Sequence, residues 1–247
     1  MIAVFLVVMP LTSAAYSQSS ESTTSLLLRF DNEHDLAAKE RLLRTLTDKD
    51  AGAGPSLLRL AESTSNTDTR WMAMRGMATL HYAASAPFLV ASLKDSDVLV
   101  RANAARALAD LQIRSASDAL LTMFAAETQS AAIEQASLAL RLLNIKAAAP
   151  YIRQKIPIRT GQTRVWLIQA LGTLGNAATD VPLIAGYLDD MSSPMAATEA
   201  IQELTGVNFG PKTLGVSPWP TPEMLAAQAW WKSHKNEWPH CDDCHLK

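Results

Sequence analysis

Cysteine and aromatic residues are scarce in this chain of 247 residues. Only two cysteines occur, and aromatic residues make up 6% of the sequence. Runs of Val, Ile and Thr are also few. Strands favour β-branched and aromatic residues, so this composition argues against a protein built on β-sheets.

An excess of positive charge is missing as well. The chain has 22 Lys and Arg against 24 Asp and Glu, which gives a formal net charge of −2. A protein that binds duplex nucleic acid normally carries a basic excess, because much of its affinity comes from neutralising phosphates. Nucleic acid is therefore not expected as a partner.

The common catalytic motifs are absent from the sequence. There is no G-x-S-x-G nucleophile motif, no glycine-rich phosphate loop and no H-E-x-x-H zinc motif. Glu199 and Glu203 lie one turn apart and could imitate an acid/base pair, but a solvated helix face explains them more simply. These absences predict that the protein is not an enzyme.

Alanine and leucine carry much of the 48% hydrophobic content, and both are strong helix formers. In Arg101–Leu111 (R-A-N-A-A-R-A-L-A-D-L) the apolar residues follow the i, i+3, i+4, i+7 spacing of one helix face. The last leucine of this pattern recurs at intervals of 34, 31, 32, 31 and 30 residues, as Leu46, Leu80, Leu111, Leu143, Leu174 and Leu204. Small residues precede it by four and seven positions in most units, which lets neighbouring helices approach closely.

A second helix is predicted after each of these leucines. Proline stands 7 to 9 residues later in four units, as Pro55, Pro87, Pro150 and Pro182, and Asp118 takes this place in another unit. Proline suits the first position of a helix, because an N–H there would have no partner. Each unit is then a helical hairpin, which must stack on its neighbours to bury its apolar faces. The sequence predicts an all-α protein, an α-solenoid of about six hairpins over residues 35–206.

This pattern resembles the HEAT repeat family, particularly its short bacterial form related to phycobilisome-lyase repeats. The arginine that such repeats carry at the head of the first helix is found at Arg70, Arg101 and Arg164. The resemblance implies that these arginines and the nearby Asp68 and Asp97 form a ladder between successive units. Ile133 and Pro194 break the arginine column, so the ladder is expected to be interrupted.

The N-terminal residues are predicted to lie outside the repeats. Residues 1–17 hold an uncharged apolar run followed by Ala15-Tyr16-Ser17, which matches the cleavage site of a secretory signal peptide. The run is shorter than the roughly 20 residues that cross a bilayer, so no stable membrane span is expected. Residues 18–34 are predicted to be a flexible leader. The expected location is periplasmic or secreted.

The C-terminal segment 207–247 is predicted to close the array. Its first part is dense in Gly and Pro and cannot continue a helix. Pro222–Trp238 is then predicted as a capping helix whose tryptophans lie across the last hairpin, because the apolar face of an end repeat must be covered.

The two cysteines fall together in a C-D-D-C-H tail, with Cys241, Cys244 and His245 as the candidate site residues. C-x-x-C-H is the attachment motif of c-type haem, in which both thiols bond the haem and the histidine binds its iron. Met224 and His234 are the candidates for a distal iron ligand. A disulfide, which oxidising compartments favour, a strained zinc site and an inert tail are the other interpretations.

A non-enzymatic scaffold that binds a protein partner is the resulting functional prediction. Second helices are expected to line the concave surface, with candidate positions within Pro87–Leu93, Asp118–Ala126, Pro150–Lys155 and Pro182–Leu188. A haem-bearing electron-transfer protein is the alternative, and no cofactor is expected otherwise. An enzyme of the bilin-lyase or hydroxylase type is a further alternative. The hydroxylase needs paired His and Glu ligands, whereas the repeats hold only His81 besides His34 at their edge.

The mass of the natively produced protein tests these terminal assignments. We expect an N-terminus near Gln18 and a colourless protein without bound haem. If Cys241 and Cys244 form a disulfide, the mass falls about two daltons below that of the reduced chain. A Soret band, together with a mass increase of one covalently held haem that Cys241→Ser with Cys244→Ser abolishes, would contradict the cofactor-free prediction. An intact Met1 would contradict export.

Overall fold

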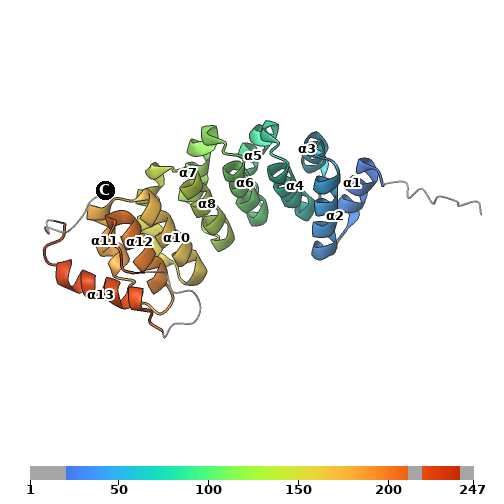
Figure 1. Ribbon diagram of the computed structural model, residues 1–247. Coiled ribbons are helices and arrows are strands. Elements are labelled where there is room, and N and C mark those ends of the chain that lie inside the picture. Colours follow the sequence, from blue (N-terminus) through green and yellow to red (C-terminus); the bar gives the residue numbers. More distant parts are fainter. Residues whose placement is uncertain (1–20, 211–218, 240–247) are drawn as a thin grey trace, which may run out of the picture.

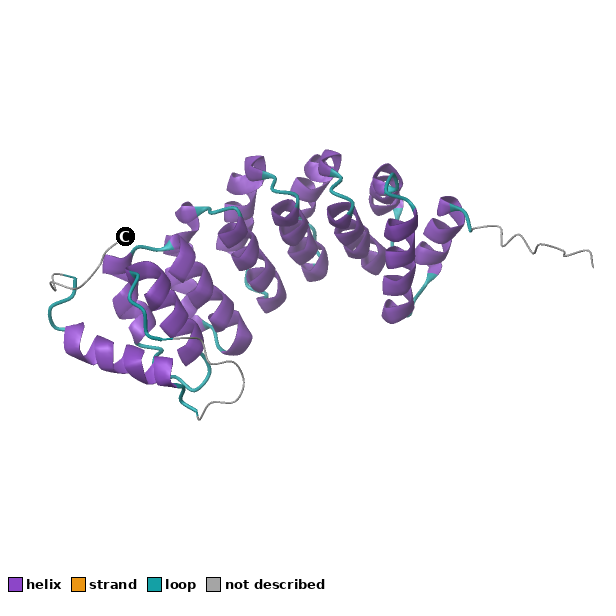
Figure 2. Cartoon of the chain, in the orientation of Figure 1, coloured by secondary structure: helices purple, strands orange, loops and turns teal. Residues whose placement is uncertain are grey.

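The structure is a computed structural model, which describes residues 21–210 and 219–239. These residues form helices and connecting loops, without any strand (Figure 2). The prediction of an all-α solenoid is confirmed. No helix among these residues is long and apolar enough to span a membrane.

Six first helices follow one another along the stack (Figure 1). They are α2 (Leu36–Lys49), α4 (Thr67–Thr79), α6 (Val98–Asp110), α8 (Ser130–Leu142), α10 (Gly161–Leu174) and α12 (Pro194–Thr205). Five second helices return between them: α3 (Gly54–Ser63), α5 (Ala86–Ser92), α7 (Ser117–Ala126), α9 (Ala149–Lys155) and α11 (Ala177–Ala185). Two further helices, α1 (Thr23–Asn32) and α13 (Pro222–His234), lie at the two ends of the array.

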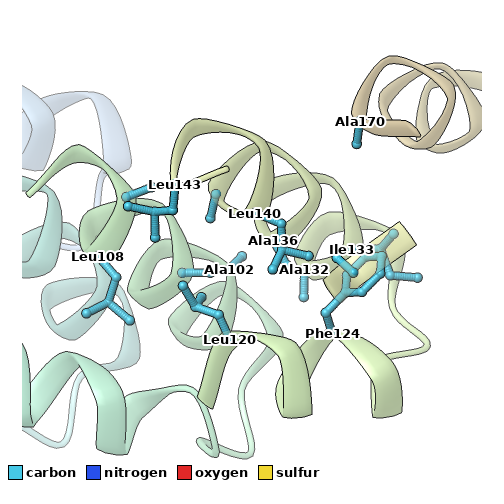
Figure 3. Packing of buried hydrophobic residues seen from close by; sticks show 14 of the residues in the cluster. Ala102, Leu108, Leu120, Phe124, Ala132, Ile133, Ala136, Leu140, Leu143 and Ala170 are labelled. Atoms are coloured by element: carbon cyan, nitrogen blue, oxygen red, sulfur yellow. The ribbon is translucent and has the colours of Figure 1, made fainter. Parts of the chain in front are cut away.

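The small-residue columns bring successive first helices into direct contact. Ala104 and Ala136 are fully buried, and in Figure 3 Leu120 and Phe124 of α7 lie among the residues of this core. The approach is closest between α10 and α12, where a Cβ on Gly172 would lie 2.8 Å from the Cα of Ala200. Only a glycine leaves room for a backbone at that distance.

Three first helices end in the same way, directly after the leucine that defines the repeat. His81, Gln112 and Asn144 each adopt a positive φ. The N–H of the next residue then donates to the carbonyl oxygen five residues earlier, as in the Schellman motif, for example from Ile113 to Leu108 at 2.9 Å. His81 is therefore a helix-ending residue.

The stack bends, with α3, α5 and α7 along its outer edge and α4, α6, α8 and α10 along its inner edge (Figure 1). The prediction that second helices line the concave surface is therefore wrong. First helices occupy the inner edge because small residues let them pack directly on one another, whereas the second helices stand further apart.

Residues 18–34 are not simply a flexible leader, because they contain α1. Ser22 caps this helix through a hydrogen bond from the N–H of Ser25 at 3.2 Å, and Leu26 and Phe30 are buried. The end of α1 is tied to the first units, since Thr64 donates to the carboxylate of Asp31 at 2.7 Å. A single helix without a counterpart in the repeat pattern covers the apolar face that the first hairpin would otherwise expose.

Helix α13 begins at Pro222, as the predicted capping helix does, but it ends at His234, so that Trp238 lies beyond it. Met224 and Ala227 are fully buried. Pro182 does not begin α11, as the sequence suggested, but lies inside it. Because proline has no N–H, the carbonyl of Ala178 four residues earlier loses its helical donor. The indole of Trp238 donates to that carbonyl at 3.1 Å, so the cap is fastened to a backbone group that Pro182 leaves open.

Substituting the two packed glycines should give different costs. Glycine to alanine favours a helix by about 1 kcal/mol. Gly172→Ala meets the backbone of Ala200, whereas Gly76→Ala meets only the movable side chains of Leu43 and Leu57. We therefore expect Gly172→Ala to destabilise the protein by about 1–3 kcal/mol and Gly76→Ala to cost less, measured by urea denaturation. A more stable Gly172→Ala variant would contradict the contact between α10 and α12.

Candidate partner-binding surface

An apolar groove of about 920 Å³ separates the second helices α5 and α7. Its walls are small or apolar: Pro87, Val90, Ala91, Ala119, Thr122, Met123 and Ala126. Three of these residues are alanines, Ala91, Ala119 and Ala126, whose small side chains leave space between the helices. The groove is formed by parts of two segments, Pro87–Leu93 and Asp118–Ala126. The sequence predicted both segments as partner-binding positions.

Charged residues stand at the margins of the groove. Lys94 and the ion pair of Arg101 with Glu127 lie toward the C-terminal ends of α5 and α7, and Asp118 lies at the beginning of α7. The groove is thus apolar along its walls with opposite charges at its limits. Such a groove suits a segment of a partner protein that carries both apolar and charged side chains.

Arg101 binds two turns of the chain at once. Its Nη1 donates to the carbonyl oxygen of Asp95 at 2.9 Å, in the turn before its own helix. Its Nε and Nη2 donate to the two carboxylate oxygens of Glu127 at 2.8 and 3.2 Å, in the turn before the next first helix. This geometry fixes the two turns relative to each other with one side chain.

The carboxylate of Glu127 stays ionised in this setting. Burial opposes its ionisation, but hydrogen bonds from Arg101 and from the N–H groups of Gln129 and Thr128 outweigh that effect, so its pKa lies below the usual value of 4.5. The same pair raises the pKa of Arg101. A depressed carboxylate pKa contributes stability above about pH 4.5, which is lost as the pH falls through the folded-state value.

Two other units repeat this arrangement. Arg70 joins the carbonyl oxygen of Thr64 to Asp95, and Arg164 joins the carbonyl oxygen of Arg159 to Asp190. The predicted arginines therefore form a ladder, but with different carboxylates. The expected partner Asp97 instead caps α6 through the N–H groups of Leu99 and Val100.

The interruption at Ile133 is bridged from another helix. Lys155 at the end of α9 donates from its Nζ to the carbonyl oxygens of Glu127 at 2.8 Å and Ala125 at 3.3 Å. The carbonyl of Glu127 is the counterpart of those that the arginines bind in other units. The ammonium of Lys155 thus binds the carbonyl that the missing arginine would have bound, and so replaces one half of that connection between turns. Burial lowers the pKa of Lys155.

A second groove, of about 740 Å³, crosses the first helices α4, α6 and α8 and is more polar. Its arginines are already neutralised inside the protein, since Arg75 pairs with Glu40 at 2.8 Å and Arg106 with Asp110 at 2.9 Å. Its carboxylate Glu134 accepts a hydrogen bond from Thr163. The α5–α7 groove is therefore the stronger candidate for a partner.

Residues 54–141 match the family of HEAT repeats. A solved structure of the complex of CpcE and CpcF of phycocyanin lyase from Nostoc sp. PCC7120 contains a chain with a similar fold. The likeness has a TM-score of 0.54 at 16% sequence identity, and it covers 98% of this chain and 96% of that one. No curated protein sequence matches this chain.

The prediction that the protein is not an enzyme is wrong. It was drawn from missing motifs and from the repeat architecture, and the same architecture over nearly the whole chain occurs in a phycocyanin lyase. The missing motifs and the repeat architecture therefore do not exclude a part in catalysis. At this identity the likeness shows the fold and does not assign a substrate.

The predicted haem-site residues Cys241, Cys244 and His245 lie outside the described residues, so the haem motif stays a prediction. Of the two candidate distal ligands, Met224 lies in α13 and is fully buried. The ring of His234 stacks on Trp230 at 4.8 Å between centroids. No cluster of three potential metal ligands occurs within residues 21–210 and 219–239.

Sequence reasoning missed Glu127 and Lys155, which hold the turns beside the groove. The signal for Glu127 is its spacing, since it follows Asp95 by 32 residues in the same place of the next unit. Lys155 carries no comparable signal. Its role depends on the absence of an arginine at position 133 and on the packing of α9 against the preceding turn.

Proposed function

We propose that this protein is a HEAT-repeat subunit that binds a protein partner in the α5–α7 groove. The observation that carries the proposal is the apolar groove itself, walled by alanines and bounded by Lys94 and Asp118. Water contacts its apolar walls in the free protein, and a partner side chain that displaces this water gains hydrophobic stabilisation.

The likeness to a two-chain lyase supports the same proposal. The solved structure is a complex of two different proteins, CpcE and CpcF, and one of its chains has the fold described here. We extend this to propose a second protein chain as the partner. Such binding suits a subunit of an enzyme, so a lyase-type subunit is the second candidate function.

The proposal also includes the location of the protein, which is periplasmic or secreted. The apolar run and the Ala15-Tyr16-Ser17 pattern support export, and a periplasmic or secreted partner would follow from it. Export would also bring the C-D-D-C-H tail into an oxidising compartment, where a disulfide or a covalently attached haem is chemically accessible.

Photo-crosslinking in the native host tests the groove. A photoreactive phenylalanine analogue at Asp118, an exposed residue at the groove margin, should form an adduct with a specific protein. Adding Thr122→Arg, which fills the groove from an exposed position on its wall, should abolish this adduct. The matched change Ala131→Arg, also exposed but beside the first-helix groove, should leave it intact.

Circular dichroism of both arginine variants is the control for folding. An adduct that survives Thr122→Arg, or that forms equally from a crosslinker at Ala131, would contradict the assignment of the groove. Mass spectrometry of the adduct identifies the partner and thereby separates a structural complex from a lyase-type one.

A further inference from the structure

Arg159 reverses the charge of a repeated position. The turns that precede successive first helices place Asp95, Glu127, Arg159 and Asp190 at intervals of 32, 32 and 31 residues. The three carboxylates each bind an arginine of the ladder. The remaining residue of this series, Arg159, is itself an arginine.

The residues that the structure describes give Arg159 no counter-charge. The arginine column holds Ile133 in this unit, so a carboxylate at position 159 would have no guanidinium to bind. The missing guanidinium explains why position 159 does not need an acidic residue. It does not explain why the position holds a positively charged one. Within the described part of the chain Arg159 forms no ion pair, and its Nε is buried without a hydrogen-bond partner.

The surroundings make this charge less favourable. Lys155 lies close by, and its pKa is lowered first by burial and then by the positive charge of Arg159. The carboxylate of Asp180 is not available as a counter-charge, because it is fully buried and binds Arg153. The backbone of Arg159 is fixed, since its carbonyl accepts from Arg164 at 2.7 Å.

Two large apolar side chains in the same α9 segment as this cation are exposed. Ile158 directly precedes it and is 72% exposed, and Tyr151 on α9 is 37% exposed. Residues 151, 155 and 158 follow the i, i+4, i+7 spacing of one helix side as α9 continues into the 3₁₀ turn Ile156–Ile158. An apolar surface beside an uncompensated cation fits a polypeptide better than an inorganic anion, which would gain nothing from Ile158.

We propose that Arg159, Ile158 and Tyr151 form a docking site for an acidic segment of a partner protein, whose Asp or Glu carboxylate supplies the missing counter-charge. Carboxylate is the group that binds each guanidinium of the ladder in this fold. An apolar residue beside it in the partner covers Ile158. The overall negative charge of the chain and the internal pairing of Arg153 disfavour nucleic acid here. This proposal does not depend on the α5–α7 groove.

Nuclear magnetic resonance of the full chain tests the site. The probe is an unlabelled peptide with Leu-Asp-Glu-Leu between glycine–serine flanks, added to the isotope-labelled protein and compared with a matched peptide containing Leu-Asn-Gln-Leu. The acidic peptide should shift the Nε–H signal of Arg159 and the amide signal of Ile158 in a saturable way, and the neutral peptide should not. Arg159→Gln should weaken binding about tenfold. The matched change Arg106→Gln, at an arginine paired with Asp110 on α6, should not.

Several outcomes would overturn the proposal. The first is an absence of shifts at Arg159, or equal shifts with the neutral peptide. If free glutamate shifts the same signals at the same concentration as the acidic peptide, the site binds anions without recognising a polypeptide. A change of the Arg159 signal on Asp242→Asn with Asp243→Asn, before any peptide is added, would show that the chain's own tail fills the site. Ile158→Ser separates the apolar contribution and should weaken the acidic peptide while leaving the fold intact.

Discussion

One guanidinium that binds two successive turns is the interaction on which this solenoid depends. Arg101 joins the carbonyl of Asp95 to the carboxylate of Glu127, and Arg70 and Arg164 do the same in other units. Apolar packing between helices is roughly additive and without strict direction, so it leaves neighbouring hairpins some freedom to slide or rotate. A bidentate hydrogen bond from a planar group removes much of that freedom. The rungs thus set the spacing of the turns, and with it the width of the groove between α5 and α7.

Departures from this rule indicate where the surface is open to partners. At Ile133 the rung is lost, and Lys155 restores only its carbonyl side. The carboxylate side has no counterpart, and the position carries Arg159 instead. The groove lies one unit before this site along the same row of turns.

The repeat could be predicted from the sequence, because its leucines recur at nearly constant spacing. The helix ending that three units share, with positive φ at His81, Gln112 and Asn144, is visible only in the structure. The ladder was only partly predictable. Asp95 and Asp97 both lie shortly before Arg101 in the chain, and only geometry shows that Asp97 caps the helix while Asp95 receives Arg70. The curvature of the stack could not be predicted, since it arises because successive first helices pack closer to one another than successive second helices do. The helix α1 was missed because a single segment shows no periodic counterpart.

Hydrogen exchange after Arg101→Gln tests the role of the ladder most directly, with Arg106→Gln on the same helix as the control. Arg106 forms a largely exposed pair with Asp110, which contributes little. Arg101 is mostly buried against Glu127, so its loss should cost about 1–3 kcal/mol of stability. The account predicts faster exchange at the N–H groups of residues 128 and 129, which bind Glu127, and little change for the control. Equal exchange and equal stability in the two variants would contradict the claim that the arginine rungs hold the units together.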